Sequence, residues 1–215
     1  MTDISLDTRS RILDAAGEIF AVSGFRQATV RQISARAGVN VAAINYHFQS
    51  KDNLYLETMR HWKNIAFRKY PGELGTSQTD PPEKRLEGFI RSFVFRILDT
   101  GVESRFGRLM AREFAEPTVA LDVIVEETAR PMLGLISSIV GRITGQPPES
   151  NTVLYCCASI VGQCLYFLYA RPVLLRLVGQ DRVRSMEMDD IARHIFRFSL
   201  AALYSIRDEK TGDPQ

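Results

Sequence analysis

The spacing of apolar residues between residues 83 and 100 restricts the fold of this chain more than any other feature. Seven large apolar side chains recur there at intervals of three and four residues, which places them on one face of a helix: Leu86, Phe89, Ile90, Phe93, Val94, Ile97 and Leu98. The same period recurs along most of the 215 residues, and no stretch alternates apolar and polar residues as a strand would. The sequence therefore predicts an all-α fold.

Start and stop signals for four helices lie in the first quarter of the chain. In order they are Gly24 after a first helix over about 8–23, a capping box of Thr29 and Gln32, Gly38 at a corner, Asn40 before a third helix over 41–48, and Ser50 before a fourth. Two short helices that meet at a glycine corner are typical of a helix-turn-helix. The residues expected to pack inward are Ile33, Ala37, Ile44 and Phe48.

The second helix of this pair has a composition that suits contact with DNA. Its first residues, Val41, Ala42 and Ala43, are small, so the helix can approach base edges in the major groove, where Val41 can meet a thymine methyl. The helix that begins at Thr29 presents free backbone N–H groups, which are a natural phosphate site. The pair is therefore predicted to bind double-stranded DNA.

The stretch from Thr29 to Leu54, TVRQISARAGVNVAAINYHFQSKDNL, resembles the signature of the tetracycline-repressor (TetR) family. The shared features are a Thr cap, an Ala-Gly-Val turn, a Tyr-His-Phe end and a Lys three residues later. The resemblance covers residues 9–56, about a quarter of the chain. Within it, the runs 40–48 and 50–55 are similar to the branch with a CecR-like C-terminal domain.

The resemblance implies which residues contact DNA, with one departure. Where the family commonly has a Tyr that touches phosphate, this chain has Asn45. An amide can hydrogen-bond a phosphate or bind adenine through two hydrogen bonds, so both roles stay open for Asn45. The expected DNA-binding residues are Thr29, Arg31, Asn40, Val41, Ala42, Asn45, Tyr46, His47 and Lys51.

The remainder of the chain is predicted to form a larger helical bundle. Residues 71–82 hold three prolines and two glycines and indicate a loop, and Pro131 should kink or split a helix over 118–143. Further helices are expected over 83–100, 103–115, 151–170 and 189–207, followed by a frayed tail from Asp208. We divide the chain into a helix-turn-helix DNA-binding domain at 8–52 and a helical ligand-binding and dimerisation domain at 53–208.

The resemblance also implies a homodimer, for which the helices over 151–170 and 189–207 are the best candidates. The first carries Ala158, Ser159 and Gly162, which are small enough for close helix approach, and the second has two apolar stripes. Packed against their symmetry mates, these helices would form an isologous four-helix interface. The alternative is an ordinary core within one chain.

A small-molecule effector of unknown identity is implied as well, and its pocket would lie among the middle helices. Each candidate residue has an alternative role in the core or on the surface. The ligand-binding candidates are Arg91, Phe95, Phe106, Met110, Glu113, Phe114, Arg130, Gln163, Tyr166 and Phe167.

Composition and motif searches argue against several classes of protein. The formal net charge of +2 does not indicate DNA binding, so that prediction rests on local arrangement. Three cysteines without a CxxC spacing do not suggest a disulfide framework or a zinc site. Without a GxSxG, an HExxH or a glycine-rich phosphate loop, we expect no enzyme, no metal and no cofactor.

Residues 153–170 carry no charge and are long enough to approach a membrane-spanning helix. A helix that is apolar all round can equally lie inside a bundle, and this interpretation is favoured. The N-terminus has no apolar leader, so we expect a cytoplasmic protein with no membrane partner.

The sequence thus predicts a DNA-binding transcriptional regulator, a ligand-responsive repressor that binds a palindromic operator as a homodimer. Two alternatives remain open. The protein could activate transcription with the same fold, or it could bind a ligand while its head no longer binds DNA. Asn45 is the residue that keeps the second alternative open.

Overall fold

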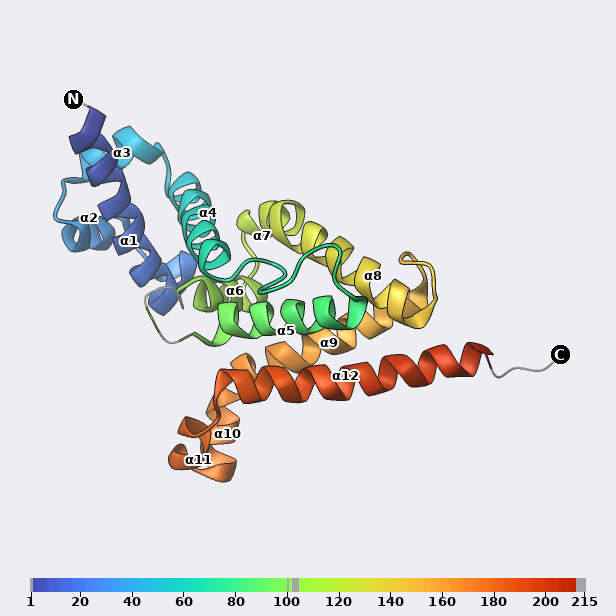
Figure 1. Ribbon diagram of the computed structural model, residues 1–215. Coiled ribbons are helices and arrows are strands. Elements are labelled where there is room, and N and C mark those ends of the chain that lie inside the picture. The colour runs from blue at the N-terminus through green and yellow to red at the C-terminus, as the bar shows by residue number, and fades with distance from the viewer. Residues whose placement is uncertain (1, 100, 102–104, 212–215) are drawn as a thin grey trace. The chain divides into compact units, whose positions relative to one another are not determined.

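The computed structural model describes residues 2–99, 101 and 105–211, and no strand occurs in these ranges (Figure 1). The predicted all-α fold is confirmed. The helices are α1 (Thr2–Gln27), α2 (Val30–Ala37), α3 (Val41–Phe48), α4 (Lys51–Lys69), α5 (Pro82–Leu98), α6 (Arg105–Ala115), α7 (Ala120–Ile124), α8 (Arg130–Thr144), α9 (Asn151–Tyr169), α10 (Arg171–Val178), α11 (Gln180–Arg184) and α12 (Met188–Thr211), with a π-helical turn at Val125–Ala129.

Two of the predicted breaks between helices are confirmed. The loop expected over 71–82 separates α4, which ends at Lys69, from α5, which begins at Pro82. Pro131 lies in the first turn of α8, directly after the π-helical turn, and so divides the helix expected over 118–143. A proline is tolerated at a helix start because its missing N–H has no helical partner there.

Gly24 has the non-helical angles φ 72° and ψ 171°, so the first helix is interrupted at Gly24 as predicted. A further helical turn follows, in which the Ala28 N–H donates to the Gly24 carbonyl at 3.3 Å, and α1 is therefore counted to Gln27. Other predicted boundaries are wrong. Two helices that were not predicted, α10 and α11, follow α9, because Pro172 in the first turn of α10 starts a helix as readily as it stops one. The helix α12 continues through Thr211 and so includes the first residues of the segment that was expected to fray from Asp208.

Residues 100 and 103–104, at the ends of two predicted helices, and residues 212–215 of the predicted tail lie outside the described residues.

Residue contacts group the chain into two units. The first comprises residues 1–69 and 100–127, and the second comprises residues 70–99 and 128–215. The functional division into 8–52 and 53–208 stays a prediction.

The first unit has an apolar core that α1 and α4 share with the two short helices between them. The four residues expected to pack inward are buried: Ile33, Ala37, Ile44 and Phe48. Phe20 of α1 meets Tyr55 of α4 edge to face, with ring centroids 4.8 Å apart. Full burial of a side chain of this size contributes about 2–3 kcal/mol, so these contacts hold the short helices in place.

Helix α6 is fastened to α1 at two points. Arg105 forms an ion pair with Glu18 at 2.5 Å, and Arg112 donates a hydrogen bond to the Val22 carbonyl. The Arg105 guanidinium also lies 4.5 Å from the ring centroid of Trp62, which is 2% exposed. The Trp62 Nε1–H donates to the Leu13 carbonyl at 3.4 Å. The indole therefore sits where α1, α4 and α6 meet.

A buried carboxylate joins α4 to the chain that follows α6. Glu113 is fully buried and accepts a hydrogen bond from the Tyr55 hydroxyl at 2.9 Å and one from the Thr118 backbone N–H at 2.7 Å. Burial, together with the neighbouring Glu113 charge, holds the pKa of Tyr55 well above its ordinary value, so Tyr55 remains a donor.

The second unit is a bundle of α5, α8, α9 and α12. The stripe predicted over residues 86–98 faces its core: Leu86, Phe89, Ile90, Val94 and Ile97 are buried, and Phe93 and Leu98 are partly buried. Cys157 and Cys164 are buried too, and desolvation raises the pKa of Cys164 to about 12. The two thiols therefore have the environment of core residues.

Helix α5 carries two buried arginines, Arg85 and Arg96. The Arg96 guanidinium donates to the Tyr70 carbonyl at 3.0 Å and to the Ser92 hydroxyl, and desolvation lowers the pKa of Arg96 to about 10. These hydrogen bonds attach the loop after α4 to α5.

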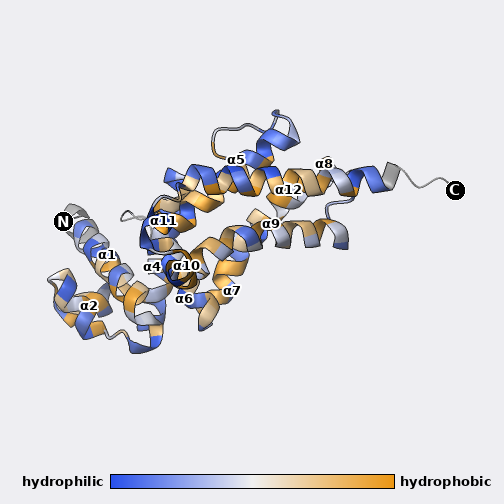
Figure 2. Cartoon of the chain, turned by 90° about the horizontal axis from the view of Figure 1, so that it is seen from below, coloured by the Kyte–Doolittle hydropathy of each residue, from blue (hydrophilic) through white to orange (hydrophobic). Residues whose placement is uncertain are grey.

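Helix α9 is buried on one side only. Val153, Cys157, Ile160 and Cys164 face the core, whereas Tyr155 on the opposite face is 66% exposed. The expectation that this helix is buried is therefore wrong for a single chain. By length and composition Asn151–Tyr169 would suffice to cross a membrane, and 28% of its apolar window is buried. Figure 2 shows apolar residues in orange along this helix.

A pH-dependent contact supports the first unit. Glu127 accepts hydrogen bonds from Arg60 at 2.6 Å and from Lys63 at 3.0 Å, and these two donors lower the pKa of Glu127 to about 2. A carboxyl whose pKa is lowered by folding stabilises the fold above its unfolded pKa, and this contribution is lost as the pH falls.

We expect Glu127→Gln to lower the free energy of unfolding at pH 7 by at most about 1 kcal/mol, because the pair is partly exposed. The difference from the wild type should shrink as the pH falls from the ordinary glutamate value of 4.5 through about 2. Urea unfolding followed by circular dichroism at several pH values measures it. Glu116→Gln, which removes another exposed carboxylate, is the control, and a difference that does not change with pH would contradict the assignment.

Candidate DNA-binding site

The N-terminus of α2 is closed by the predicted capping box. The Gln32 N–H donates to Thr29 Oγ1 at 3.2 Å, and the Thr29 N–H donates to Gln32 Oε1 at 2.9 Å. Thr29 and Arg31 are exposed. The box satisfies the third N–H of the helix and leaves those of Val30 and Arg31 directed outward, where a phosphate oxygen can accept both.

The corner between α2 and α3 has the geometry that the glycine pattern predicts. Gly38 has φ 65° and ψ 39°, the left-handed conformation that only glycine adopts without strain. The Gly38 N–H donates to the Ala35 carbonyl at 3.3 Å, and the Val39 N–H donates to the Ser34 carbonyl at 3.0 Å. This is a Schellman motif, and it fixes the direction in which the chain leaves α2.

Helix α3 presents one polar and small-residue face to solvent. Asn40 caps its start, since Asn40 Oδ1 accepts the Ala43 N–H at 2.8 Å. Because residues one turn apart share a helix face, the exposed side chains form one continuous strip, and Tyr46 within it is 82% exposed. The predicted residues on this strip are Asn40, Val41, Ala42, Asn45 and Tyr46.

The remaining predicted residues flank this strip. His47 is partly buried and packs edge to face on Tyr46, with ring centroids 5.2 Å apart. Lys51 is held against the end of α1, where its Nζ donates to the Arg26 carbonyl at 3.3 Å and lies 4.6 Å from the Phe25 ring centroid. The Lys51 ammonium is therefore fixed in position rather than freely solvated.

The segment that carries the candidate site is locally basic, which the net charge of the whole chain does not reveal. Between Glu18 and Asp52 the sequence has no acidic residue and four basic ones, Arg26, Arg31, Arg36 and Lys51. Arg36 is paired with Glu18 at 2.6 Å, while Arg26 and Arg31 are exposed. A local charge count would have found this signal, which favours an anionic partner although the net charge of the chain is only +2.

The joint between α3 and α4 is strained. Gln49 has φ 65° and ψ −42°, and the Ser50 N–H donates to the Phe48 carbonyl at 2.7 Å. These values are close to a classic γ-turn, which is rare outside glycine. The Phe48 carbonyl also accepts the Asn53 side-chain amide at 3.0 Å, so α3 and α4 meet at a defined angle.

The predicted ligand-binding residues are divided between the two units, and no single pocket in the described part of the chain is lined by all of them. In the first unit Phe106 and Glu113 are buried in the core, Met110 packs against it and Phe114 is half exposed. In the second unit Phe95 packs edge to face on Tyr70, Tyr166 packs edge to face on Phe167, Arg130 is exposed, and Gln163 donates to the Ser199 hydroxyl at 3.2 Å.

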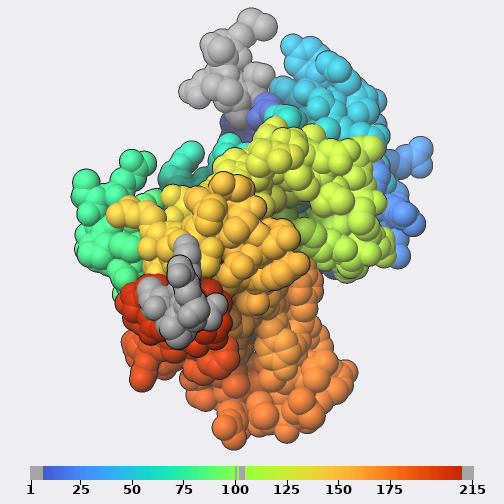
Figure 3. Space-filling model, turned by 90° about the vertical axis from the view of Figure 1, so that its right-hand side faces the viewer, coloured from blue at the N-terminus to red at the C-terminus, as the bar shows by residue number. Residues whose placement is uncertain are grey.

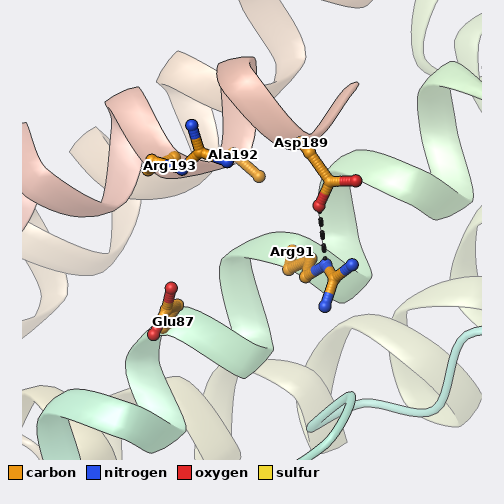
Figure 4. A pocket seen from close by; sticks show the side chains of 5 residues that line it. All are labelled: Glu87, Arg91, Asp189, Ala192 and Arg193. Atoms are coloured by element: carbon orange, nitrogen blue, oxygen red, sulfur yellow. Dashed lines mark ion pairs between the residues drawn. The ribbon is translucent and has the colours of Figure 1, made fainter. Parts of the chain in front are cut away.

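Arg91, the remaining candidate, lies in a surface cleft of about 400 Å³ between α5 and α12 (Figure 4). Its guanidinium forms an ion pair with Asp189 at 2.9 Å across the cleft and lies 5.2 Å from the Phe95 ring centroid. Glu87 and Arg193 complete a lining of both signs. The balanced charges give this cleft no preference for an anion or a cation.

Two family models match the chain. Residues 12–58 match the model described as bacterial regulatory proteins, tetR family, and residues 82–203 match the model for the C-terminal domain of the HTH-type transcriptional dual regulator CecR. The second match spans more than half of the chain.

The chain is similar to a curated dual regulator and to a curated repressor. The HTH-type transcriptional dual regulator CecR of Shigella flexneri is 25% identical over 189 residues, which cover 83% of each chain. The HTH-type transcriptional repressor KstR2 of Mycolicibacterium smegmatis is 34% identical over 85 residues, 40% of this chain and 41% of that relative.

Solved structures share the fold. A TetR-like transcriptional regulator from Rhodococcus sp. RHA1 matches with a TM-score of 0.64 and 16% identity, covering 91% of this chain and 95% of that one. AibR, solved in complex with isovaleryl coenzyme A and operator DNA, matches with a TM-score of 0.66 and 13% identity, covering 89% and 97%.

The strain at Gln49 leads to a stability prediction. We expect Gln49→Gly to raise the free energy of unfolding by about 1 kcal/mol, because glycine adopts this conformation freely and the relief exceeds its cost in chain entropy. Gln49→Ala keeps the Cβ atom and should bring no gain. Urea denaturation measures both variants, and a Gln49→Gly protein no more stable than the alanine variant would show that the turn is unstrained.

Proposed function

Because the chain belongs to the TetR family of bacterial transcriptional regulators and carries a CecR-type C-terminal domain, we propose that it is a repressor that binds a palindromic operator as a homodimer. A small-molecule effector would release it from DNA. We keep residues 8–52 as the DNA-binding domain and 53–208 as the ligand-binding and dimerisation domain. Action on bacterial DNA implies a cytoplasmic protein.

The observation that carries this proposal is the exposed strip of α3. It begins at a capped helix start, Asn40, and follows the capped start of α2 at Thr29, in a stretch without acidic residues, and its first side chains are small. An α-helix of this profile fits the major groove of B-DNA with its N-terminal residues at the base edges.

The positions of the side chains suggest a division of roles. Val41, Ala42 and Asn40, at the start of α3, are proposed to face bases. Thr29, with the N–H groups behind it, Arg31, Tyr46, His47 and Lys51 are proposed to hold phosphates on either side. Asn45, in the middle of the strip, can take either role.

The exposed faces of α9 and α12 support dimerisation. Tyr155 on α9 is 66% exposed and Phe198 on α12 is 62% exposed, and both border a groove of about 390 Å³ between the two helices. Figure 3 shows α9 in orange beside the red α12. Ala158, Ser159 and Gly162 on α9 are exposed and small, which allows a second copy to approach closely.

Effector control would follow from two states that bind the effector with different affinity. The ten candidate ligand residues remain proposals, and the chemical class of the effector is open. Activation is the alternative that stays closest to this proposal, since the CecR relative is named a dual regulator. Enzymatic activity is not part of the proposal.

Binding to DNA from the flanks of its own coding region tests the function. A gel shift at moderate salt with dimeric protein should show one specific complex. Lys51→Ala should weaken binding to every sequence and reduce the salt slope by about one, since one phosphate contact is lost. Asn45→Ala should abolish the preference for one base at one operator position if Asn45 contacts a base. It should weaken binding to every sequence equally if Asn45 contacts phosphate.

The control for Lys51→Ala is Arg68→Ala, which removes an exposed positive charge near the end of α4 and should leave the slope unchanged. The absence of any specific complex would refute the regulator, and a changed base preference in Lys51→Ala would refute its phosphate role. Genome-wide capture of bound DNA then identifies the operator.

The dimer interface has its own test. Phe198→Glu should raise the dimer dissociation constant about 100-fold or more, because it places an unpaired charge in the contact and removes a large aromatic anchor. Leu133→Glu, at an exposed apolar position on α8, is the matched control. Analytical ultracentrifugation measures both, and a Phe198→Glu protein that dimerises like the control would place the interface elsewhere.

A further inference from the structure

Helix α2 ends in a pair of carbonyls that a distant side chain binds. Arg11, on α1, donates from Nη2 to the Ala37 carbonyl at 2.7 Å and to the Gly38 carbonyl at 3.1 Å. The partners are 26 and 27 residues away in the sequence. We propose that Arg11 is a positioning residue for operator recognition, which fixes the corner from which α3 leaves α2 without touching DNA.

The physical reason lies in the end of α2. The last carbonyls of a helix lack helical donors and carry partial negative charge. The Schellman motif satisfies those of Ser34 and Ala35, and the carbonyls of Ala37 and Gly38, further along the turn, accept from Arg11. A guanidinium supplies both a positive charge and several donors in one plane, so it can bind two adjacent carbonyls at once.

Arg11 is itself well anchored. The next residues on α1, Ile12 and Leu13, are at most 1% exposed in the core of the first unit. The Arg11 guanidinium also lies 3.9 Å from Asp7, one turn earlier. A Cβ atom added at Gly38 would lie 3.1 Å from Arg11 Nη2, which shows how closely the guanidinium covers the corner. The position of α1 is thereby transmitted directly to the turn.

A second arginine of α1 acts on the other helix of the pair. The Arg9 guanidinium forms an ion pair with Glu57 of α4 and lies 5.4 Å from the ring centroid of Phe48, the last residue of α3. Each helix of the helix-turn-helix therefore has an arginine of α1 at its C-terminal end. Arg9 acts through a side-chain contact, whereas Arg11 binds the backbone of the turn itself.

The inference rests on the proposed DNA binding and predicts a loss of specificity rather than of general affinity. Arg11→Met keeps the apolar stem and removes the donors. Its affinity for the operator fragment should fall about tenfold, the size expected for one charged hydrogen-bonded contact. Its affinity for an unrelated duplex, and the salt slope on both, should stay at wild-type values, because no phosphate contact is lost.

The controls separate geometry from charge. Arg68→Ala removes one positive charge outside the corner and should change neither DNA affinity nor specificity. Arg11→Lys keeps the charge and some donors, so it should recover part of the specificity. A loss of affinity for both duplexes with a slope lower by about one would mean that Arg11 contacts phosphate, and it would overturn the proposal. Unchanged operator binding in Arg11→Met would overturn it as well.

A measurement that needs no DNA tests the role of Arg11 at the corner separately from the proposed DNA binding. Amide hydrogen exchange of Gly38 and Val39, whose N–H groups close the Schellman motif, should become several-fold faster in Arg11→Met and stay unchanged in Arg68→Ala. If the wild type binds no specific DNA, the proposed function fails, and faster exchange would still show that Arg11 fixes the corner. Unchanged exchange would refute the role of Arg11 whatever the DNA result.

Discussion

Helices α2 and α3 are each eight residues long, which is too short for a helix to persist in water without outside support. The positions of the exposed side chains in the candidate site therefore depend on the contacts that stabilise these two helices. The Thr29 box closes the start of α2, Asn40 closes the start of α3, and the buried faces of both helices rest on α1 and α4. The exposed faces are then free to carry residues chosen for a partner rather than for stability.

The same unit binds its helices together through shared side chains. The Glu18 carboxylate accepts hydrogen bonds from Arg36 of α2 and from Arg105 of α6, so one side chain of α1 contacts two other helices. The Glu113 carboxylate similarly joins Tyr55 of α4 to the segment after α6. A displacement of α6 would therefore be transmitted through these contacts to α1, α2 and α4, the helices against which α3 packs or to which it is joined.

The features predicted from the sequence are those that short stretches determine by themselves. The Thr29 box, the Gly38 corner and the apolar stripe over 86–98 depend on spacings of three or four residues, and each was predicted correctly. The bond from Arg11 to Ala37 joins residues that no local pattern relates, so the sequence did not indicate it. For α9 the sequence left two interpretations, a core helix and a dimer interface, because an apolar composition does not distinguish a core from an unpaired interface. Helix α10 was missed because Arg171 and Pro172 were interpreted as a stop rather than as the start of a helix, and α11 was missed because its five residues, QDRVR, contain a single apolar one.

Trp62 is the single tryptophan of the chain, and it lies where α1, α4 and α6 meet, with Arg105 over its ring. Indole emission depends on the polarity and charge around the ring, so the native protein contains an optical probe at the junction of these three helices. Fluorescence of the unlabelled protein can then be recorded while candidate effectors are titrated, with no engineered reporter. A change in emission would come from that one site, which allows ligands to be screened before any operator sequence is known.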